Sequence, residues 1–161
     1  MSHIPMEQTQ VYAEEKGLAN RAWLLVRDWE SFARWSVGRQ LCASLDSVGA
    51  NLAEGDGRFS DADALHFFVM ARGSLRESGY WIDVSADREL IQMEFCEELR
   101  RSVDSIRKQI NGLINYRRSN NNKNLIKEER SGYQVEADQE LHAGRSTLHA
   151  PFTEEMQFNE N

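Results

Sequence analysis

The sequence predicts an all-α protein, an antiparallel up-down four-helix bundle, from three observations. Apolar residues recur three and four positions apart in four separate segments, which is the spacing of an amphipathic helix. No segment alternates apolar and polar residues in the way that is typical of a strand. The connections between the helical segments are short, and short connections favour neighbouring helices that pack side by side in opposite directions.

The first two helices are predicted from two apolar stripes. The first stripe consists of Leu18, Ala22, Leu25, Trp29 and Phe32, and the second of Leu41, Leu45, Val48 and Leu52. Ser36 is placed to cap the start of the second helix. We expect the Gly-Asp-Gly segment 55–57 to end that helix, because glycine tolerates the left-handed conformation common at helix termini.

The third and fourth helices are predicted in the same way. The third begins at residues 60–63, which resemble a capping box with Asp in place of Glu. Its apolar residues are Leu65, Phe68, Ala71, Leu75 and Ile82, and those of the fourth are Cys96, Leu99, Val103, Ile106, Ile110 and Leu113. Gly73 and Gly79 in the third helix together suggest close approach of another helix, in the bundle or in a second copy. For either glycine alone, a tolerated weak point in the helix explains it equally well.

Composition divides the chain into a flexible N-terminus (1–8), the bundle domain (9–118) and a mostly disordered acidic tail (119–161). The break begins at the polar run 119–124, Ser-Asn-Asn-Asn-Lys-Asn. Beyond it, apolar residues are sparse and aperiodic, and four basic residues stand against eight acidic ones. Such a segment cannot bury enough surface to offset the entropy of ordering it. The alternative interpretation is a linear binding motif within residues 147–158.

Several classes of protein are excluded by composition. The chain has 161 residues, of which 40% are hydrophobic and 28% charged, so it can form an apolar core. None of its apolar runs is long enough to span a membrane. Cys42 and Cys96 are too few for a disulfide framework or a zinc site. The first residues lack the pattern of a secretory signal, so we expect a cytoplasmic protein. A net charge of −7 argues against a general nucleic-acid coat, although bulk charge hides its position.

A dense motif runs through the second helix and the connection after it. Its residues are Gln40, Ser47, Asn51, Glu54, Gly55, Gly57, Arg58 and Ser60. This pattern resembles the signature of a bacterial four-helix-bundle family, named after proteins encoded in intervening sequences of 23S ribosomal RNA genes. Ser74 and Glu77, in the third helix, resemble the second signature of that family. The resemblance covers about residues 10–116.

The resemblance implies a homo-oligomer, usually a pentameric ring. The family is structurally similar to the accessory protein of diversity-generating retroelements, which binds a reverse transcriptase and nucleic acid. Two features depart from the family pattern. The connection at about residues 31–37 is shorter than usual and lacks the family's proline, and the acidic tail has no counterpart.

Residues suited to catalysis are scarce, so we expect no enzymatic activity, no metal and no cofactor. Asp63 and His66 supply only one imperfect half of the Glu-x-x-His pairs that a di-iron bundle needs. His3, His142 and His149 lie in the expected flexible ends, where no pairing with a nucleophile can be argued.

Two interpretations remain open for Asn51, Glu54, Arg58 and Ser60. They could form a ligand site, or they could satisfy backbone groups at the corner between the second and third helices while Arg58 pairs with Glu54. The structural interpretation is the favoured one.

The fourth helix carries the candidate nucleic-acid interface. Its basic residues are Arg100, Arg101, Arg107, Lys108, Arg117 and Arg118, and Asp104 is the one acidic residue among them. Two pairs recur seven residues apart on the solvent side of the apolar stripe, where arginine could contact phosphates. A solvated helix face with cations near its C-terminus is at least as good an explanation.

Trp23 and Trp81 are the candidate oligomer interface. Trp23 lies off the first apolar stripe, and Trp81 is adjacent to Tyr80, so these aromatic residues cannot all face one core. Aromatic residues outside a small bundle form an apolar patch that a second copy would bury. The alternative is that these aromatic residues lie singly on the surface or are covered by the tail.

Two functions are compatible with these observations. The favoured one is a non-enzymatic homo-oligomer, a pentamer, that acts as a nucleic-acid or ribonucleoprotein accessory with RNA or DNA as partner. The alternative is a protein-binding scaffold, for example an accessory to a reverse transcriptase.

Overall fold

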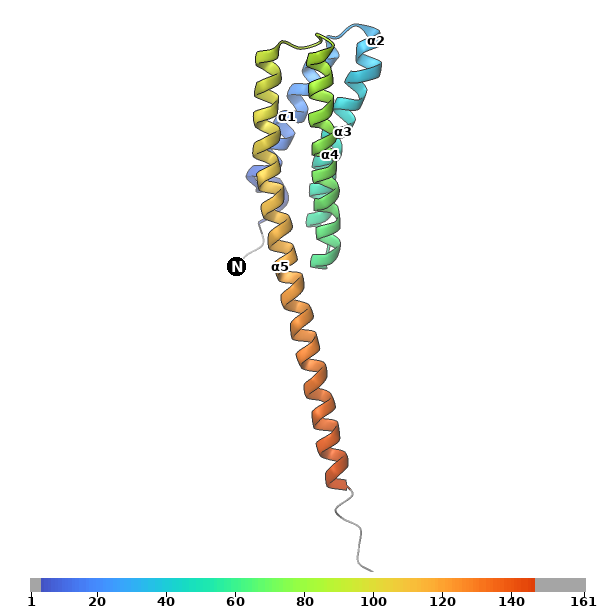
Figure 1. The fold of residues 1–161 in the computed structure, drawn as a ribbon, viewed down its shortest axis with the longest axis vertical. Helices are drawn as coiled ribbons and strands as arrows, with labels where there is room; N and C mark the ends of the chain where they lie inside the picture. Colours follow the sequence, from blue (N-terminus) through green and yellow to red (C-terminus); the bar gives the residue numbers. More distant parts are fainter. Residues whose placement is uncertain (1–3, 147–161) are drawn as a thin grey trace, which may run out of the picture. The chain divides into compact units, whose positions relative to one another are not determined.

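A computed structural model describes the backbone of residues 4–146 and the side chains of residues 4–128. All regular elements in that range are helical, and it holds no strand. The long helices are α1 (Gln10–Arg27), α3 (Arg39–Asp56), α4 (Asp61–Asp87) and α5 (Met93–Ser146) (Figure 1). The short ones are η1 (Met6–Gln8), α2 (Ser31–Ala33) and the π-helical η2 (Arg34–Gly38).

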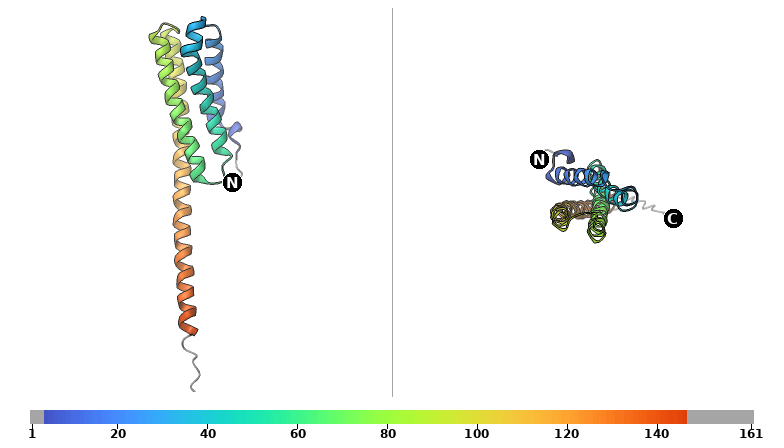
Figure 2. Two further views of the ribbon diagram at one scale, coloured as in Figure 1. Left: turned by 90° about the vertical axis from the view of Figure 1, so that its right-hand side faces the viewer. Right: turned by 90° about the horizontal axis from the view of Figure 1, so that it is seen from above.

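Of the described residues, 4–121 form one compact unit, and a second unit begins at Asn122. Within the first unit, α1, α3, α4 and the first part of α5 lie side by side (Figure 2). The described part of the second unit is the remainder of α5, which is helical as far as Ser146.

One apolar core joins the four long helices of the first unit. Its fully buried large side chains include Leu18, Leu41, Leu45, Leu52, Phe68, Leu75, Ile82, Leu99, Ile106, Ile110 and Ile114. Burial of each such side chain stabilises the fold by about 1.5–3 kcal/mol relative to exposure. The stripe predicted for the fourth helix is thus the core face of α5, where Val103 and Leu113 are partly buried.

Contacts between neighbouring helices run in opposite numerical order. On α3 and α4, Ser47 pairs with Ser74 at 3.0 Å between hydroxyl oxygens, whereas the later Gly55 packs against the earlier Phe68. On α4 and α5, Arg72 donates to Asn111 Oδ1 at 3.3 Å, and the later Asp83 accepts from Arg100, which precedes Asn111.

The predicted course of the first helix was wrong at its C-terminal end. α1 ends at Arg27, so Trp29 and Phe32 lie outside it, and Phe32 is 79% exposed. Helical structure restarts at once, because the Glu30 carboxylate accepts from the backbone N–H of Ala33 at 3.1 Å and caps α2. Ser36 is therefore not a cap: it lies inside η2, and its hydroxyl donates to the Phe32 carbonyl at 2.6 Å.

The glycine that ends α3 does not adopt the predicted left-handed conformation. Gly57 is the C-cap with a φ of −73°, and none of the described glycines adopts a positive φ. Gly55 is required for space, because a Cβ there would lie 2.6 Å from Phe68 Cε1. The predicted cap of the third helix is confirmed, since the Ser60 hydroxyl accepts from Asp63 N at 3.0 Å. Around Gly73, by contrast, an added Cβ would meet nothing within 4 Å.

Both predicted domain ends need correction. Met6 is 2% exposed and its N–H donates to Asp56 Oδ2 at 3.0 Å, so residues 6–8 are anchored to the bundle rather than part of a flexible N-terminus. At the other end, α5 continues through the polar run 119–124 to Ser146. Asn and Ser cost a helix only about 0.5 kcal/mol each, and the strong helix formers that follow sustain it. Residues 1–3 and 147–161, with the proposed linear motif, lie outside the described residues.

Candidate functional site

The motif residues of α3 form a polar ladder against α4. Asn51 Nδ2 donates to the Ser47 carbonyl at 2.7 Å and to the Ser47 hydroxyl at 3.2 Å. That hydroxyl in turn lies 3.0 Å from the Ser74 hydroxyl on α4. The three side chains are partly buried, so their polar groups are satisfied by one another between the helices.

The remaining motif residues close the corner between α3 and α4. Glu54 forms an ion pair with Arg58, whose guanidinium also lies 4.5 Å from the centre of the Phe67 ring. The corner therefore uses the Glu54 and Arg58 side chains internally, which matches the structural interpretation of the motif. Gln40 is exposed, and the Glu77 carboxylate accepts from the Trp81 indole at 3.3 Å.

Ion pairs engage half of the basic residues of the candidate nucleic-acid interface. Arg100 pairs with Asp83 at 2.6 Å, and Arg107 pairs with Asp104 at 2.8 Å. Arg117 is mostly buried and pairs with Asp61 at 3.0 Å. Such pairing lowers the attraction of these cations for a phosphate.

Three of the six basic residues of the candidate nucleic-acid interface keep their charge available to solvent. Arg101, Lys108 and Arg118 are exposed, and no ion pair engages them within residues 4–128. Arg101 and Lys108 are seven residues apart, so they lie on one face of the helix. The predicted patch is thus reduced from six cations to a smaller cationic face.

The two tryptophans expected at an oligomer interface lie in different environments. Trp23 is 55% exposed on α1, whereas Trp81 packs against the core. The neighbour of Trp81, Tyr80, is 59% exposed and lies edge-on to the Trp81 ring. The exposed aromatic residue on α4 is therefore Tyr80 rather than Trp81.

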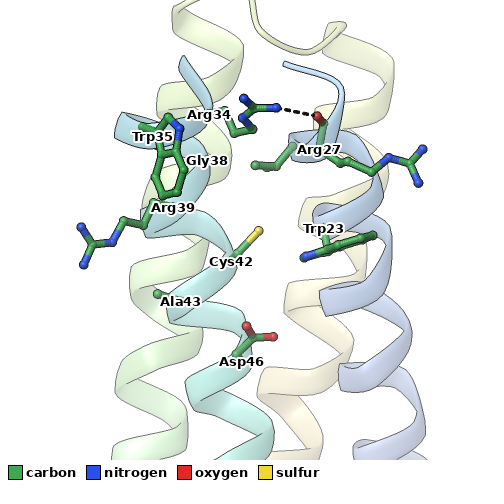
Figure 3. A pocket seen from close by; sticks show the side chains of 10 residues that line it. Trp23, Arg27, Arg34, Trp35, Gly38, Arg39, Cys42, Ala43 and Asp46 are labelled. Carbon is green, nitrogen blue, oxygen red and sulfur yellow. Dashed lines mark hydrogen bonds between the residues drawn. The ribbon is translucent and has the colours of Figure 1, made fainter. Parts of the chain in front are cut away.

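A groove that the sequence analysis missed lies beside Trp23. It runs between α1 and the η2–α3 segment, has a volume of about 440 Å³ and contains three arginines (Figure 3). Its lining residues are Trp23, Val26, Arg27, Arg34, Trp35, Gly38, Arg39, Cys42, Ala43 and Asp46, and we call it the Trp23–Trp35 groove. The sequence signal for it is the density of aromatic and arginine residues between positions 23 and 39, a pattern that the helical spacing of apolar residues does not reveal.

A buried carboxyl group was also missed. Glu15 is 3% exposed at the α1–α3 contact, and its Oε1 has no hydrogen-bond partner. Burial, reinforced by the nearby Asp46 carboxylate, raises the pKa of Glu15 to about 7. The spacing Val11, Glu15, Leu18 and Ala22 places Glu15 in the core stripe of α1, so this signal was present in the sequence.

No metal centre or membrane span is found in the part of the chain that the structure describes. His66 is exposed and its ring lies edge-on to Phe67, while the Asp63 carboxylate accepts from Ser60, so this half-site stays incomplete. Groups of three or more metal-ligating side chains are absent from the described residues. Among those residues, no helix is both long and apolar enough to cross a bilayer.

Fold and motif together define the class of protein: a small helical bundle whose densest motif holds two helices together. The family model described as "23S rRNA-intervening sequence protein" matches residues 7–112, so the chain belongs to this family. In fold, it is similar to a crystal structure of a protein of unknown function from the S23 ribosomal protein family of Bacteroides thetaiotaomicron. The two are 24% identical with a TM-score of 0.59, covering 65% of this chain and 97% of that one. A comparison with curated proteins found no match.

Proposed function

We propose that this protein is a non-enzymatic, homo-oligomeric accessory of a nucleic acid or a ribonucleoprotein, built as an antiparallel up-down four-helix bundle. The opposite order of the contacts between neighbouring helices supports the antiparallel arrangement. The bundle supplies a rigid surface rather than a reactive centre.

The observation that carries the proposal is the cationic face of α5. Arg101 and Lys108 point their charge to solvent on a chain whose net charge is −7. Cations without a carboxylate partner are the ones that can release counterions from a phosphate backbone. If an oligomer repeats this face, several weak contacts act on the same nucleic acid, and the overall affinity exceeds that of one copy.

Self-association rests on the apolar side chains that the single chain leaves in solvent. Val69 and Tyr80 are 38% and 59% exposed. On α4, Gly73 lies beside Val69 in a surface groove between α4 and α5, and its open surroundings leave room for a helix of a second copy. We take the pentamer implied by the family resemblance as the expected state.

The alternative function is a protein-binding scaffold, with a reverse transcriptase as one such partner. The acidic balance of the chain favours this alternative, because a surface rich in carboxylates attracts basic proteins.

Affinity purification from the native host, with and without nuclease treatment, tests the proposal. We expect nucleic acid in the untreated sample and loss of the co-purifying proteins after nuclease. A partner protein that stays bound after nuclease treatment, with no nucleic acid recovered, would instead establish the scaffold function.

A further inference from the structure

The Trp23–Trp35 groove combines exposed tryptophan and arginine side chains. Trp35 is 69% exposed on η2, and Trp23 is 55% exposed on α1, on the other side of the groove (Figure 3). Arg39 lies one helical turn beyond Trp35, and Arg27 one turn beyond Trp23. Each wall therefore presents an aromatic ring with a guanidinium group nearby.

Close backbone packing fixes the shape of this groove. Gly38 is buried, and a Cβ at that position would overlap Val26 Cγ1 on α1. The backbones of η2 and α1 can therefore approach closely beneath the two rings. A π-helical turn, such as η2, re-aims side chains relative to a regular helix and is frequent at functional sites.

The charge of the groove is opposite to that of the chain. Its lining contains three arginines and one acidic residue, Asp46, whereas the whole chain carries −7. The Arg27 guanidinium forms an ion pair with the Asp28 carboxylate at 3.0 Å, and the Arg34 guanidinium donates a hydrogen bond to the Arg27 backbone carbonyl at 3.4 Å. Arg39 is exposed, and no ion pair engages it within residues 4–128.

We propose that the Trp23–Trp35 groove binds single-stranded RNA. Unpaired bases stack on the Trp35 and Trp23 rings, and the phosphates between them contact Arg39 and Arg34. Exposed aromatic rings beside arginines are the combination that binds single-stranded nucleic acid. Every base has a planar face that can stack on an aromatic ring, and every phosphodiester carries a negative charge that attracts arginine. The volume of about 440 Å³ suits a ligand of the size of a nucleotide or two.

Asp46 is the reason to favour RNA over DNA. Its carboxylate lines the groove and can only accept hydrogen bonds, so it repels a phosphate but accepts from the 2′-hydroxyl of a ribose. DNA lacks that donor. Bases paired within a duplex cannot stack on the two rings, so double-stranded RNA should bind poorly.

A two-fold contact with a second copy is a poorer occupant of the groove. In a two-fold contact, the same surface of both copies meets itself, which would bring the arginines of one groove against those of the other. Like charges placed together across an interface are destabilising.

This inference rests on the proposed function but locates the contact away from α5, so separate variants can test the two. The probe is a fluorescein-labelled single-stranded RNA of twelve nucleotides, titrated with the full chain and followed by anisotropy. Trp35→Ala and Arg39→Gln test the groove, and the pair Arg101→Gln with Lys108→Gln tests α5. Phe59→Ala, which removes an exposed aromatic ring from the corner between α3 and α4, is the matched control.

We expect Trp35→Ala and Arg39→Gln each to weaken binding at least about fivefold, with Phe59→Ala unchanged and the circular dichroism of all variants preserved. The duplex and the DNA strand of the same sequence should bind more weakly than the RNA. A loss caused by the α5 variant alone would overturn the groove while leaving the proposed function standing. Absence of binding by the wild-type chain would overturn both.

Two further outcomes would also overturn the inference. If Trp35→Ala lowers the oligomer mass in light scattering, the groove is a contact between copies. If DNA binds as tightly as RNA, the role given to Asp46, and with it the assignment to RNA, is wrong.

Discussion

Glu15 on α1 faces Gly49 on α3, with its Oε2 only 2.5 Å from the position that a Cβ at residue 49 would occupy. A carboxyl group is thus enclosed where a helix pair would ordinarily bury an apolar side chain. Asp46, one turn before Gly49, adds a like charge close by. The bundle therefore contains a titratable group whose neutral form the fold prefers.

The first prediction concerns stability against pH. The folded pKa of Glu15 is about 7 and the unfolded value is 4.5, so the folded state holds the proton more tightly. The stabilising contribution is complete below pH 4.5 and is lost as the pH rises through 7. Over that range, we expect the free energy of unfolding to fall by an amount on the order of 2–3 kcal/mol. Urea unfolding at several pH values measures it.

Glu15→Gln provides the control for that pH dependence. Glutamine keeps the size of the side chain and cannot ionise, so the variant should flatten the pH dependence and be more stable than the wild type at pH 8. Retention of the full pH dependence in the variant would show that another group causes it.

The second prediction concerns the crowded glycine at the α3–α4 corner. Gly55→Ala should destabilise the bundle by about 1–3 kcal/mol, because its methyl group would press on the buried Phe68 ring. Gly112→Ala is the matched control on a helix surface with open space, and it should be neutral or stabilising by up to about 1 kcal/mol. Equal effects of the two substitutions on the thermal midpoint would contradict the packing argument.

The third prediction separates the structural interpretation of the motif from a ligand site. Asn51→Ala removes the hydrogen bonds to Ser47 and should cost about 1–2 kcal/mol of stability. Nucleic-acid binding should remain, provided that the measurement is made well below the unfolding temperature. A variant with unchanged stability and abolished binding would instead make Asn51 a ligand-binding residue.

The fourth prediction concerns the cations of α5. Replacing Arg101 and Lys108 with Gln should weaken nucleic-acid binding and lower the slope of log affinity against log salt by about 1–2. Replacing Arg100 and Arg107 removes the same charge but should have less effect, since both are held by aspartates. The reverse ranking in a salt titration would mean that the ion pairs open on binding.

The fifth prediction concerns assembly. Light scattering of the full chain at micromolar concentration should give five times the 18.6 kDa mass of one copy. Tyr80→Glu and Val69→Glu should reduce that mass if the apolar face of α4 is the contact, because a buried unpaired carboxylate is strongly disfavoured. A wild-type chain that stays monomeric would refute self-association.

Periodicity predicted the helices well where the core decides the structure. The fourth stripe is the clearest case, because Leu99, Ile106 and Ile110 are all fully buried on one face of α5. The same reasoning extended the first helix too far: beyond the turn at Asp28, Trp29 still packs against the core, but Phe32 is exposed.

Features that depend on neighbours distant in sequence could not be predicted in the same way. The pairing of Arg100 with Asp83 and the groove shared by Trp23 and Trp35 arise only once separate helices lie side by side. The continuation of α5 beyond Arg118 was not predicted, because the scarcity of apolar residues there indicates only that the segment does not enter a core. It does not exclude a helix.

Ultraviolet cross-linking of the chain in its native host, followed by mass spectrometry of the RNA-bound peptides, tests the central claim most directly. The account predicts adducts on peptides that contain Trp35 or Lys108, and loss of the first adduct in the Trp35→Ala variant. Recovery of the chain without any RNA adduct, together with a partner protein that resists nuclease, would contradict it.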